Sequence, residues 1–378
     1  MKSRPPRWRL GLLLTLAGLA MAGCVTTAPK ATIAATEPAS VFYPPLPNAP
    51  RIQYLTSISS EKDLASERDE FADFILGEER EEHRLAQPYG IAMRDGKVFV
   101  ADTGAGGIAV FDLRQKKFQF MTGSGGGRMK RPINIRIDTD GTRYITDTGR
   151  DQVLVYDAQD RFVAAYGQEG QFRPVDVAIG RDRLYVADIL HHQIHVLDKS
   201  SGKKLFVFGR AGSGDGELFH PTNLALAPDG DLYVVETGNF RVQRFTAEGK
   251  QVKTLGGVGA SLGSFARPKG IAIDRGGRMY VGDAAFQNVQ MFDAGGKLLM
   301  FFGQSENPAE ALNLPAGVTI DYDNVKSFSR YAKQGFAVEY LILVASQFGP
   351  NKIDVFGFGQ LPGKEYPADA KPATAAAS

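Results

Sequence analysis

The chain has 378 residues, with 44 Lys and Arg against 42 Asp and Glu, so its formal net charge is +2. This balance excludes the large basic excess typical of nucleic-acid-binding proteins, and we expect no nucleic-acid partner. The single cysteine excludes an intrachain disulfide and a thiolate metal cluster. Hydrophobic residues make up 43% and charged residues 23%, which is typical of a globular protein rather than a disordered or multi-span membrane protein.

Residues 1–23 are predicted to be an export signal. Basic residues without an acid precede an apolar run from Leu10 to Ala22, which is shorter than the about 20 residues of a membrane span and typical of a signal-peptide core. The run ends in Met21-Ala22-Gly23-Cys24, which resembles the lipobox of bacterial lipoproteins. The resemblance implies that Cys24 receives a lipid such as palmitate, and Val25 after it implies the outer membrane. The alternative is a signal peptide whose cysteine merely follows the cleavage site.

Two terminal segments lack any hydrophobic period. Residues 24–49 begin with the cysteine and are rich in Ala, Thr and Pro, so we predict a flexible tether there. Residues 361–378 have a similar composition and are predicted to be disordered. The folded domain is therefore predicted at residues 50–360.

One pattern recurs six times between residues 86 and 358. Each copy has a proline, an alternating apolar strand, a turn, a segment like aromatic-Val-Ala-Asp, a polar loop and a further strand. The prolines are Pro88, Pro132, Pro174, Pro221, Pro268 and Pro315, which lie 42 to 47 residues apart. A fixed period of about 40–50 residues with several short strands indicates propeller blades. The predicted fold class is therefore all-β, a six-bladed β-propeller.

The residues of these copies resemble a known repeat family. The first copy reads Pro88-Tyr-Gly-Ile-Ala with Val98-Phe-Val-Ala-Asp102, and the fifth reads Pro268-Lys-Gly-Ile-Ala with Met279-Tyr-Val-Gly-Asp283. Both are similar to NHL repeats, and the resemblance covers most of the chain. It implies an NHL-like propeller of a bacterial lipoprotein that accompanies an envelope system. It implies no single activity, because a propeller is a scaffold for many functions.

The ring is predicted to close with a strand from the N-terminal side. Each blade should have strands a to d from the channel to the rim, but the sixth copy lacks strand d. Residues 51–58 are β-rich, so we predict that they pair beside residues 352–356 and remove an exposed edge. The d–a and b–c loops then share one face, here called the top face. Residues 59–86 follow this strand and are predicted to form an amphipathic helical segment on the top face, either packed on the rim or covering the channel mouth.

An acid follows strand b in five of the six copies. These residues are Asp102, Asp147, Asp188, Glu236 and Asp283. Because the acid recurs from blade to blade, we interpret it as framework that bonds turn amides rather than as a catalytic carboxylate.

Positions that differ between blades are better candidates for function. The second residue after each proline reads Gly90, Asn134, Asp176, Asn223, Gly270 and Gly317. This predicts a channel mouth that is polar on one half and open on the other, where a ligand could bind. The alternative is that the polar groups only bond neighbouring backbone or water. The top-face loops add Arg150, His191, His192, His220 and Arg241 as ligand-binding candidates.

The leading functional hypothesis is a non-catalytic envelope lipoprotein whose top face binds a protein, peptide or glycan. It would be anchored in the outer membrane and face the periplasm or the cell surface. No catalytic residue is nominated, and the lone cysteine is assigned to the lipid. We expect no cofactor, because four blades place no histidine at the mouth.

Two other classes of function remain open. The first is a metal-dependent lyase or hydrolase, since NHL-like lyases hold zinc with histidines near the channel. Here Asp176, His191, His192 and His220 could hold zinc or calcium. The second is a structural spacer without a ligand.

Overall fold

The computed structural model describes residues 41–64, 82–304 and 310–366. The predicted export signal, Cys24 and residues 25–40 of the tether lie outside these ranges, as do residues 65–81 of the predicted helical segment. Among the described residues, no helix has the length and apolarity required to span a membrane.

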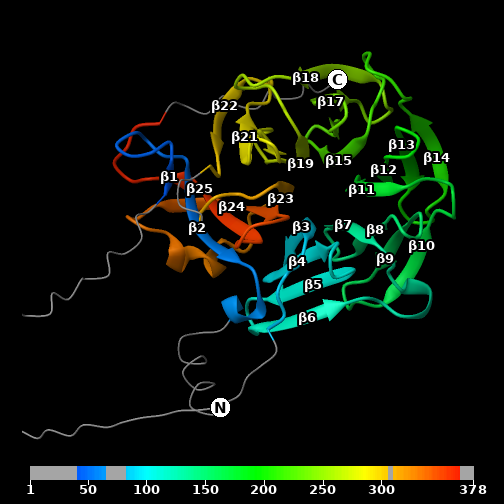
Figure 1. Ribbon diagram of the computed structural model, residues 1–378, viewed down its shortest axis with the longest axis horizontal. Coiled ribbons are helices and arrows are strands. Elements are labelled where there is room, and N and C mark those ends of the chain that lie inside the picture. Colours follow the sequence, from blue (N-terminus) through cyan, green and yellow to red (C-terminus); the bar gives the residue numbers. More distant parts are fainter. Residues whose placement is uncertain (1–40, 65–81, 305–309, 367–378) are drawn as a thin grey trace, which may run out of the picture. The chain divides into compact units, whose positions relative to one another are not determined.

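Six antiparallel sheets surround a central axis, which confirms the six-bladed β-propeller (Figure 1). The labels of the innermost strands β3, β7, β11, β15, β19 and β23 encircle the centre of Figure 1. The first three blades contain β3 (Pro88–Arg94), β4 (Lys97–Asp102), β5 (Gly107–Asp112), β6 (Lys117–Met121), β7 (Pro132–Ile137), β8 (Arg143–Asp147), β9 (Gln152–Tyr156), β10 (Phe162–Tyr166), β11 (Pro174–Ile179), β12 (Arg183–Asp188), β13 (Gln193–Asp198) and β14 (Lys204–Phe208).

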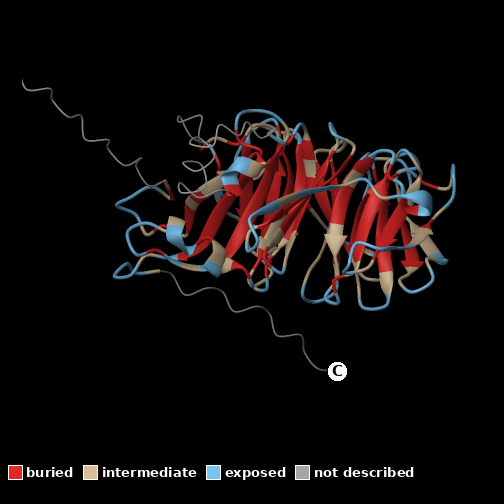
Figure 2. Cartoon of the chain, turned by 90° about the horizontal axis from the view of Figure 1, so that it is seen from below, coloured by how far each residue is buried: buried red, intermediate tan, exposed pale blue. Residues whose placement is uncertain are grey.

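Blades four and five repeat this arrangement. They contain β15 (Pro221–Leu226), β16 (Leu232–Glu236), β17 (Arg241–Phe245), β18 (Gln251–Gly256), β19 (Pro268–Ile273), β20 (Met279–Asp283), β21 (Asn288–Phe292) and β22 (Leu298–Phe302). The inner strands are buried because each blade packs between two others. In Figure 2 most strand residues of the propeller carry the buried colour. The outermost strands β6, β10, β14, β18 and β22 are mostly half-buried or exposed.

Blade six is closed by the N-terminal strand, as predicted. Its sheet has the order β1 (Phe42–Tyr43), β2 (Ile52–Ile58), β25 (Ile353–Gln360), β24 (Ala337–Ser346) and β23 (Pro315–Asp321). Strand β2 pairs antiparallel with β25, from Ile52 opposite Phe358 to Ile58 opposite Ile353. The two ends of the domain therefore share one sheet.

The predicted boundaries of the domain were wrong at both ends. Residues 41–49 were assigned to the tether, but Phe42 and Tyr43 are buried, and Phe42 packs on Phe336 with ring centroids 5.8 Å apart. Residues 361–366 were assigned to the disordered tail, but the Tyr366 hydroxyl donates to the carbonyl of Pro50 at 3.0 Å. Both segments belong to the folded domain because their aromatic rings are packed on it.

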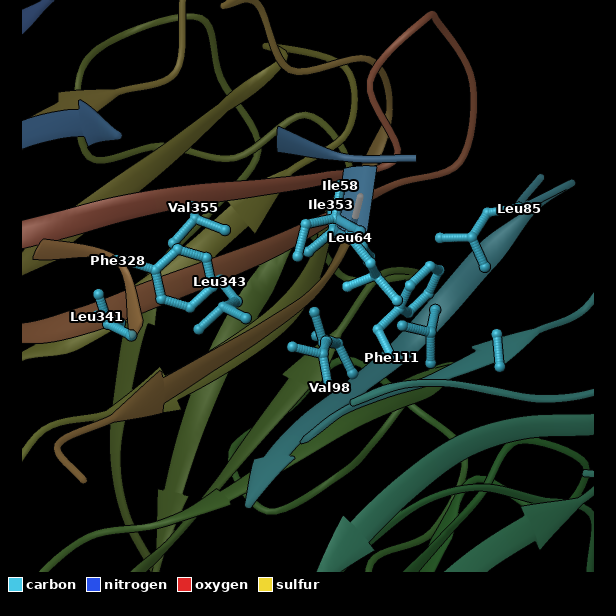
Figure 3. Packing of buried hydrophobic residues seen from close by; sticks show 14 of the residues in the cluster. Ile58, Leu64, Leu85, Val98, Phe111, Phe328, Leu341, Leu343, Ile353 and Val355 are labelled. Atoms are coloured by element: carbon cyan, nitrogen blue, oxygen red, sulfur yellow. The ribbon is translucent and has the colours of Figure 1, made fainter. Parts of the chain in front are cut away.

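The seam between blades six and one is sealed by short irregular segments. The 3-10 helix η1 (Glu61–Leu64) follows β2, and a bridge joins Ser60 to Arg84. The described ends of the predicted helical segment thus hold a 3-10 turn and a bridge, and its centre lies outside the described residues. Leu64 packs with Phe111 of blade one and Phe328 of blade six in one buried cluster (Figure 3).

Two insertions complete the described fold. The a–b loop of blade six contains η3 (Val325–Ser327) and η4 (Ser329–Tyr331), and it buries Phe328 and Phe336. The loop therefore contributes two aromatic side chains to the core. The remaining 3-10 helix of the described residues, η2 (Gly125–Gly127), lies on the loop that enters blade two.

The closing strand is predicted to be essential for stability. Ile52 of β2 is 0% exposed, so Ile52→Ala should lower the free energy of unfolding by about 2–5 kcal/mol through lost burial and a cavity. Urea unfolding measures this change, and Leu299→Ala on the exposed rim serves as the matched control. An unchanged stability of the Ile52 variant would show that the N-terminal strand is not part of the cooperative unit.

Candidate functional site at the channel mouth

The recurring acids tie two top-face loops together in each blade. Asp102 accepts the amides of Ala86 and Gln87 from the incoming d–a loop at 2.7 and 2.8 Å. It also accepts the amides of Gly104 and Ala105 from the b–c loop at 3.1 and 3.2 Å. We call this arrangement the amide bracket. It confirms the interpretation of these acids as framework.

The bracket recurs with the same geometry in other blades. Asp147 accepts the amides of Arg131 and Gly149, each at 2.9 Å, and Asp283 accepts the amide of Arg267 at 3.1 Å. In blades one, two, three and five, the backbone amide of the residue before the blade proline is therefore held by the bracket acid. Arg131, Arg173 and Arg267 occupy this position and are exposed. The brackets thus arrange arginines around the channel mouth.

Blade six uses a different residue for the same purpose. Ser346 stands where the other blades have an acid, and its hydroxyl accepts the amide of Asn313 at 3.2 Å. The carboxylate is provided instead by Asp354 of β25, which accepts from the Ser346 hydroxyl and the Asn351 amide, each at 3.2 Å. Burial raises the pKa of Asp354 to about 7.

Two of the three predicted polar residues of the mouth meet in one buried network. Asp176 binds Arg136 in a two-point ion pair, with Nε–Oδ1 3.1 Å and Nη2–Oδ2 2.7 Å. The side-chain amide of Asn223 lies 3.4 Å from Asp176, and the backbone amide of Leu224 donates to the same carboxylate at 2.9 Å. Asn134 instead accepts the amide of its own neighbour, Ile135. The acid of the mouth is therefore already neutralised by Arg136.

A tyrosine lies across the channel mouth. The Tyr89 hydroxyl is 3.2 Å from the side-chain amide of Asn223, although these residues belong to blades one and four, which face each other in a six-bladed ring. In each blade the register shifts by one residue just after the proline, as at Pro174 in β11. Such bulges re-aim side chains next to functional sites.

The prediction that one half of the channel mouth is open is wrong. A Cβ atom added to Gly90, Gly270 or Gly317 would lie 2.1 to 2.3 Å from an atom of the neighbouring inner strand. Such distances are sterically forbidden, so these glycines permit the close approach of inner strands. They mark packing rather than space for a ligand.

The arginine candidates of the loops hold other loops. Arg150 donates to the carbonyls of Gly126 and Arg128 at 2.8 and 2.7 Å. Arg241 pairs with Glu236 at 2.6 Å and donates to the carbonyl of Ser213 at 2.8 Å. These guanidinium donors hold the d–a loops that lead into blades two and four.

The histidine candidates form separate contacts. The His191 Nδ1 lies 2.6 Å from the bracket residue Asp188, and the His195 Nε2 lies 3.1 Å from the same oxygen. Burial opposes ionisation of Asp188, but bonds from His195, Arg173 and His191 hold its pKa at about 2. His192 accepts the backbone amide of His220 at 3.0 Å. Across the described ranges, no three His, Cys, Asp or Glu side chains gather where they could hold a metal ion.

A lysine that was not among the candidate residues is the most unusual group at the mouth. Lys269 is 8% exposed, and its Nζ donates to Gln347 Oε1 at 2.6 Å and lies 5.3 Å from the centre of the Tyr89 ring. Within the described part of the chain, no carboxylate pairs with it. Burial and the nearby Arg267 lower the pKa of Lys269 to about 8.

A comparison between blades could have found this residue. The first residue after each proline reads Tyr89, Ile133, Val175, Thr222, Lys269 and Ala316. Tyr89 and Lys269 differ from the small or aliphatic residues of the other blades. The polar side chains of Tyr89 and Lys269 could have identified this position, but only the second residue after each proline was compared between blades.

A serine motif was also overlooked. Residues 259–263 read Gly-Ala-Ser-Leu-Gly, which matches the Gly-x-Ser-x-Gly pattern of a nucleophile elbow. Ser261 lies on an exposed loop between β18 and β19, and a strand rather than a helix follows. The elbow needs a strand-to-helix turn, so the motif fails its structural test here.

Lys269→Met is predicted to stabilise the protein at neutral pH. The ammonium is disfavoured in the fold, where its pKa is about 8 instead of 10.5, and each pKa unit corresponds to about 1.4 kcal/mol. The variant should therefore gain up to about 3 kcal/mol at pH 7.

The predicted stability difference between Lys269→Met and the wild type depends on pH. Between about pH 8 and 10.5, Lys269 is largely deprotonated in the folded wild type but still protonated in the unfolded chain. The free energy of unfolding of the wild type therefore rises with pH in this range. The difference in stability between the wild type and Lys269→Met becomes smaller as a result. Urea unfolding across this pH range measures both effects. A destabilised variant, or a gap independent of pH, would contradict the assignment.

Comparisons with known proteins agree with this architecture. The family model described as the NHL repeat matches residues 220–245. Among solved structures, the chain is similar to a streptogramin B lyase, with a TM-score of 0.51, 16% identity and coverage of 72% of this chain and 83% of that one.

Two further structures extend the comparison. A gluconolactonase from Xanthomonas campestris has a TM-score of 0.53 and 16% identity, covering 82% of this chain and 90% of that one. A protein of unknown function from Bacteroides thetaiotaomicron has a TM-score of 0.54 and 17% identity, covering 72% and 70%. At these identities the similarity concerns the fold alone. Together with the blade geometry, it shows a six-bladed β-propeller, in which residues 220–245 match the NHL repeat.

Proposed function

We propose that the chain is an outer-membrane lipoprotein whose top face binds a protein or peptide partner without catalysis. The observation that carries this proposal is the composition of the top face, where exposed arginines and exposed apolar side chains lie on adjacent loops. Such a mixture is typical of a protein-binding surface. It favours a polypeptide over a glycan as the partner.

The apolar part of this face includes four exposed side chains. Phe219 is 39% exposed, Phe348 is 52% exposed, and Val258 and Leu262 are 75% and 71% exposed. All four lie on d–a or b–c loops, which the strand order assigns to the top face. Apolar side chains on loops gain from burial when a partner covers them.

The basic part of this face is available to a partner. Arg131 and Arg267 are exposed, and neither has a carboxylate partner among the described residues. Their positions are fixed through their backbone amides by the brackets of Asp147 and Asp283. A partner with acidic groups would therefore meet donors on a rigid frame, which reduces the entropy cost of binding.

The anchor is proposed from the sequence. The lipobox-like segment ends at Cys24, and residues 25–40 separate it from the described domain. A tether of this composition would hold the propeller near the membrane while leaving its faces accessible. The protein would face the periplasm or the cell surface.

Charge reversal on the top face is predicted to abolish partner recovery. In a cross-linked pull-down from membranes, the double variant Arg131→Glu and Arg267→Glu should lose at least tenfold of the partner recovered with wild type, because its new carboxylates repel an acidic partner. The backbone amides that serve the brackets remain in place, so the fold should persist, which circular dichroism can verify.

The matched control reverses two exposed cations on the opposite face. Arg181 lies on an a–b loop and Lys250 on a c–d loop, so Arg181→Glu with Lys250→Glu should leave partner recovery intact. If the top-face double variant recovers as much partner as the control double variant, the top-face proposal is rejected and a structural spacer is favoured.

The proposed lipid anchor is tested separately. Cys24→Ser should move the protein from the membrane to the soluble fraction.

An enzyme acting at the same channel mouth is the second candidate. Two of the similar structures are described as a streptogramin B lyase and a gluconolactonase, and propellers of this fold therefore can carry such chemistry. The second candidate would gain from zinc or calcium that co-purifies with the protein and is lost on Asp176→Ala or His220→Ala. Elemental analysis of the purified variants makes this distinction.

A further inference from the structure

We infer that Lys269 is the contact for a carboxylate group carried by the polypeptide partner, at the channel mouth beside Tyr89 and Gln347. This inference rests on the proposed binding function of the top face and names the chemistry of its centre. It assigns a specificity-determining cation to a site where the sequence pattern had suggested only neutral amides and Asp176.

The ammonium group has unused bonding capacity. It carries three N–H donors, of which one bonds the side-chain oxygen of Gln347 at 2.6 Å. The Tyr89 ring, with its centroid 5.3 Å from Nζ, provides only the diffuse attraction of an aromatic face. Asp176 is committed to Arg136 by two bonds and cannot serve as the counter-ion.

The described residues around the Lys269 ammonium come from several elements and supply no negative charge. Tyr89 comes from β3, Gln347 from the loop after β24, and Asn223 from β15, which with Lys269 itself in β19 makes four blades. Arg267, two residues earlier, adds a second cation and is exposed. A buried cation without a counter-ion is costly to the fold, and an arriving anion offsets that cost.

The chemistry of the site favours a carboxylate of a polypeptide. The amide oxygen of Gln347 already occupies an acceptor position, which a carboxylate oxygen can join or replace with a stronger, charge-assisted bond. Phe348 directly follows Gln347, and the loop with Val258 and Leu262 leads into Arg267. Apolar groups therefore flank the cations, as suits a peptide segment that carries both an acid and apolar side chains.

The experiment follows the titration of Lys269 by NMR in the purified protein with ¹³C- and ¹⁵N-labelled lysine. The resonance is assigned with Lys269→Gln, and Lys204→Gln on the exposed rim serves as the matched control. Three probes are compared at equal ionic strength: acetyl-Ala-Ala-Ala as the free acid, the same peptide as its amide, and acetyl-Ala-Glu-Ala-amide. The two acids distinguish a chain terminus from an acidic side chain.

At least one acid probe is expected to raise the titration midpoint of Lys269 in a saturable manner, while the neutral amide leaves it unchanged. The lysine signals of the Lys204→Gln protein should respond as in wild type, and partner recovery should fall at least tenfold in Lys269→Gln. A midpoint that none of the acid probes moves, or that the amide probe moves equally, would overturn the inference. If the inference fails in this way, loss of the partner in the Arg131→Glu and Arg267→Glu double variant would still support the proposed function. A failure of the inference about Lys269 can therefore be distinguished from a failure of the proposed function.

Discussion

The hydrogen bonds between a buried carboxylate and the amides of two loops determine the top face of this propeller. In each of the first five blades the acid at the end of strand b accepts backbone amides from the incoming loop, and in four of them it also accepts amides from the following loop. Buried carboxylates of this kind are stable because several N–H groups satisfy them. The rim of the channel is therefore rigid, although it consists of loops.

This constraint also separates the charges of the top face. The framework acids bond backbone amides, and in four blades one of these amides belongs to the residue before the blade proline. Three of these four residues are arginines with exposed side chains, Arg131, Arg173 and Arg267. Lys269 follows the fifth proline and is buried, and no carboxylate among the described residues pairs with it. Because a group that weakens the fold is most easily explained by function, Lys269 is the centre of the proposed site.

The sequence predicted the features that repeat. The proline period and the bracket acids were sufficient for the six blades, because each reflects a local pattern that recurs along the chain. The β-rich run at residues 51–58 was sufficient for the closure, because the sixth copy lacked a strand d. Strand β1 was missed because Phe42 and Tyr43 are too few to show a period, and they pair only through β2. The glycines of the mouth were misinterpreted because the close approach of neighbouring strands is a tertiary property. The ion pair of Asp176 with Arg136 joins adjacent blades and likewise has no sequence signature.

The central claim is that one carboxylate joins two loops of the top face. Amide hydrogen exchange in Asp283→Ala, compared with wild type, tests it most directly. The account predicts that the amides of Ala266 and Arg267 lose protection together with those of Ala285 and Phe286, which bond the same carboxylate. Asp293→Ala, in a turn on the opposite face, should affect only its own turn. Unchanged exchange at either loop of the Asp283 variant would contradict the claim.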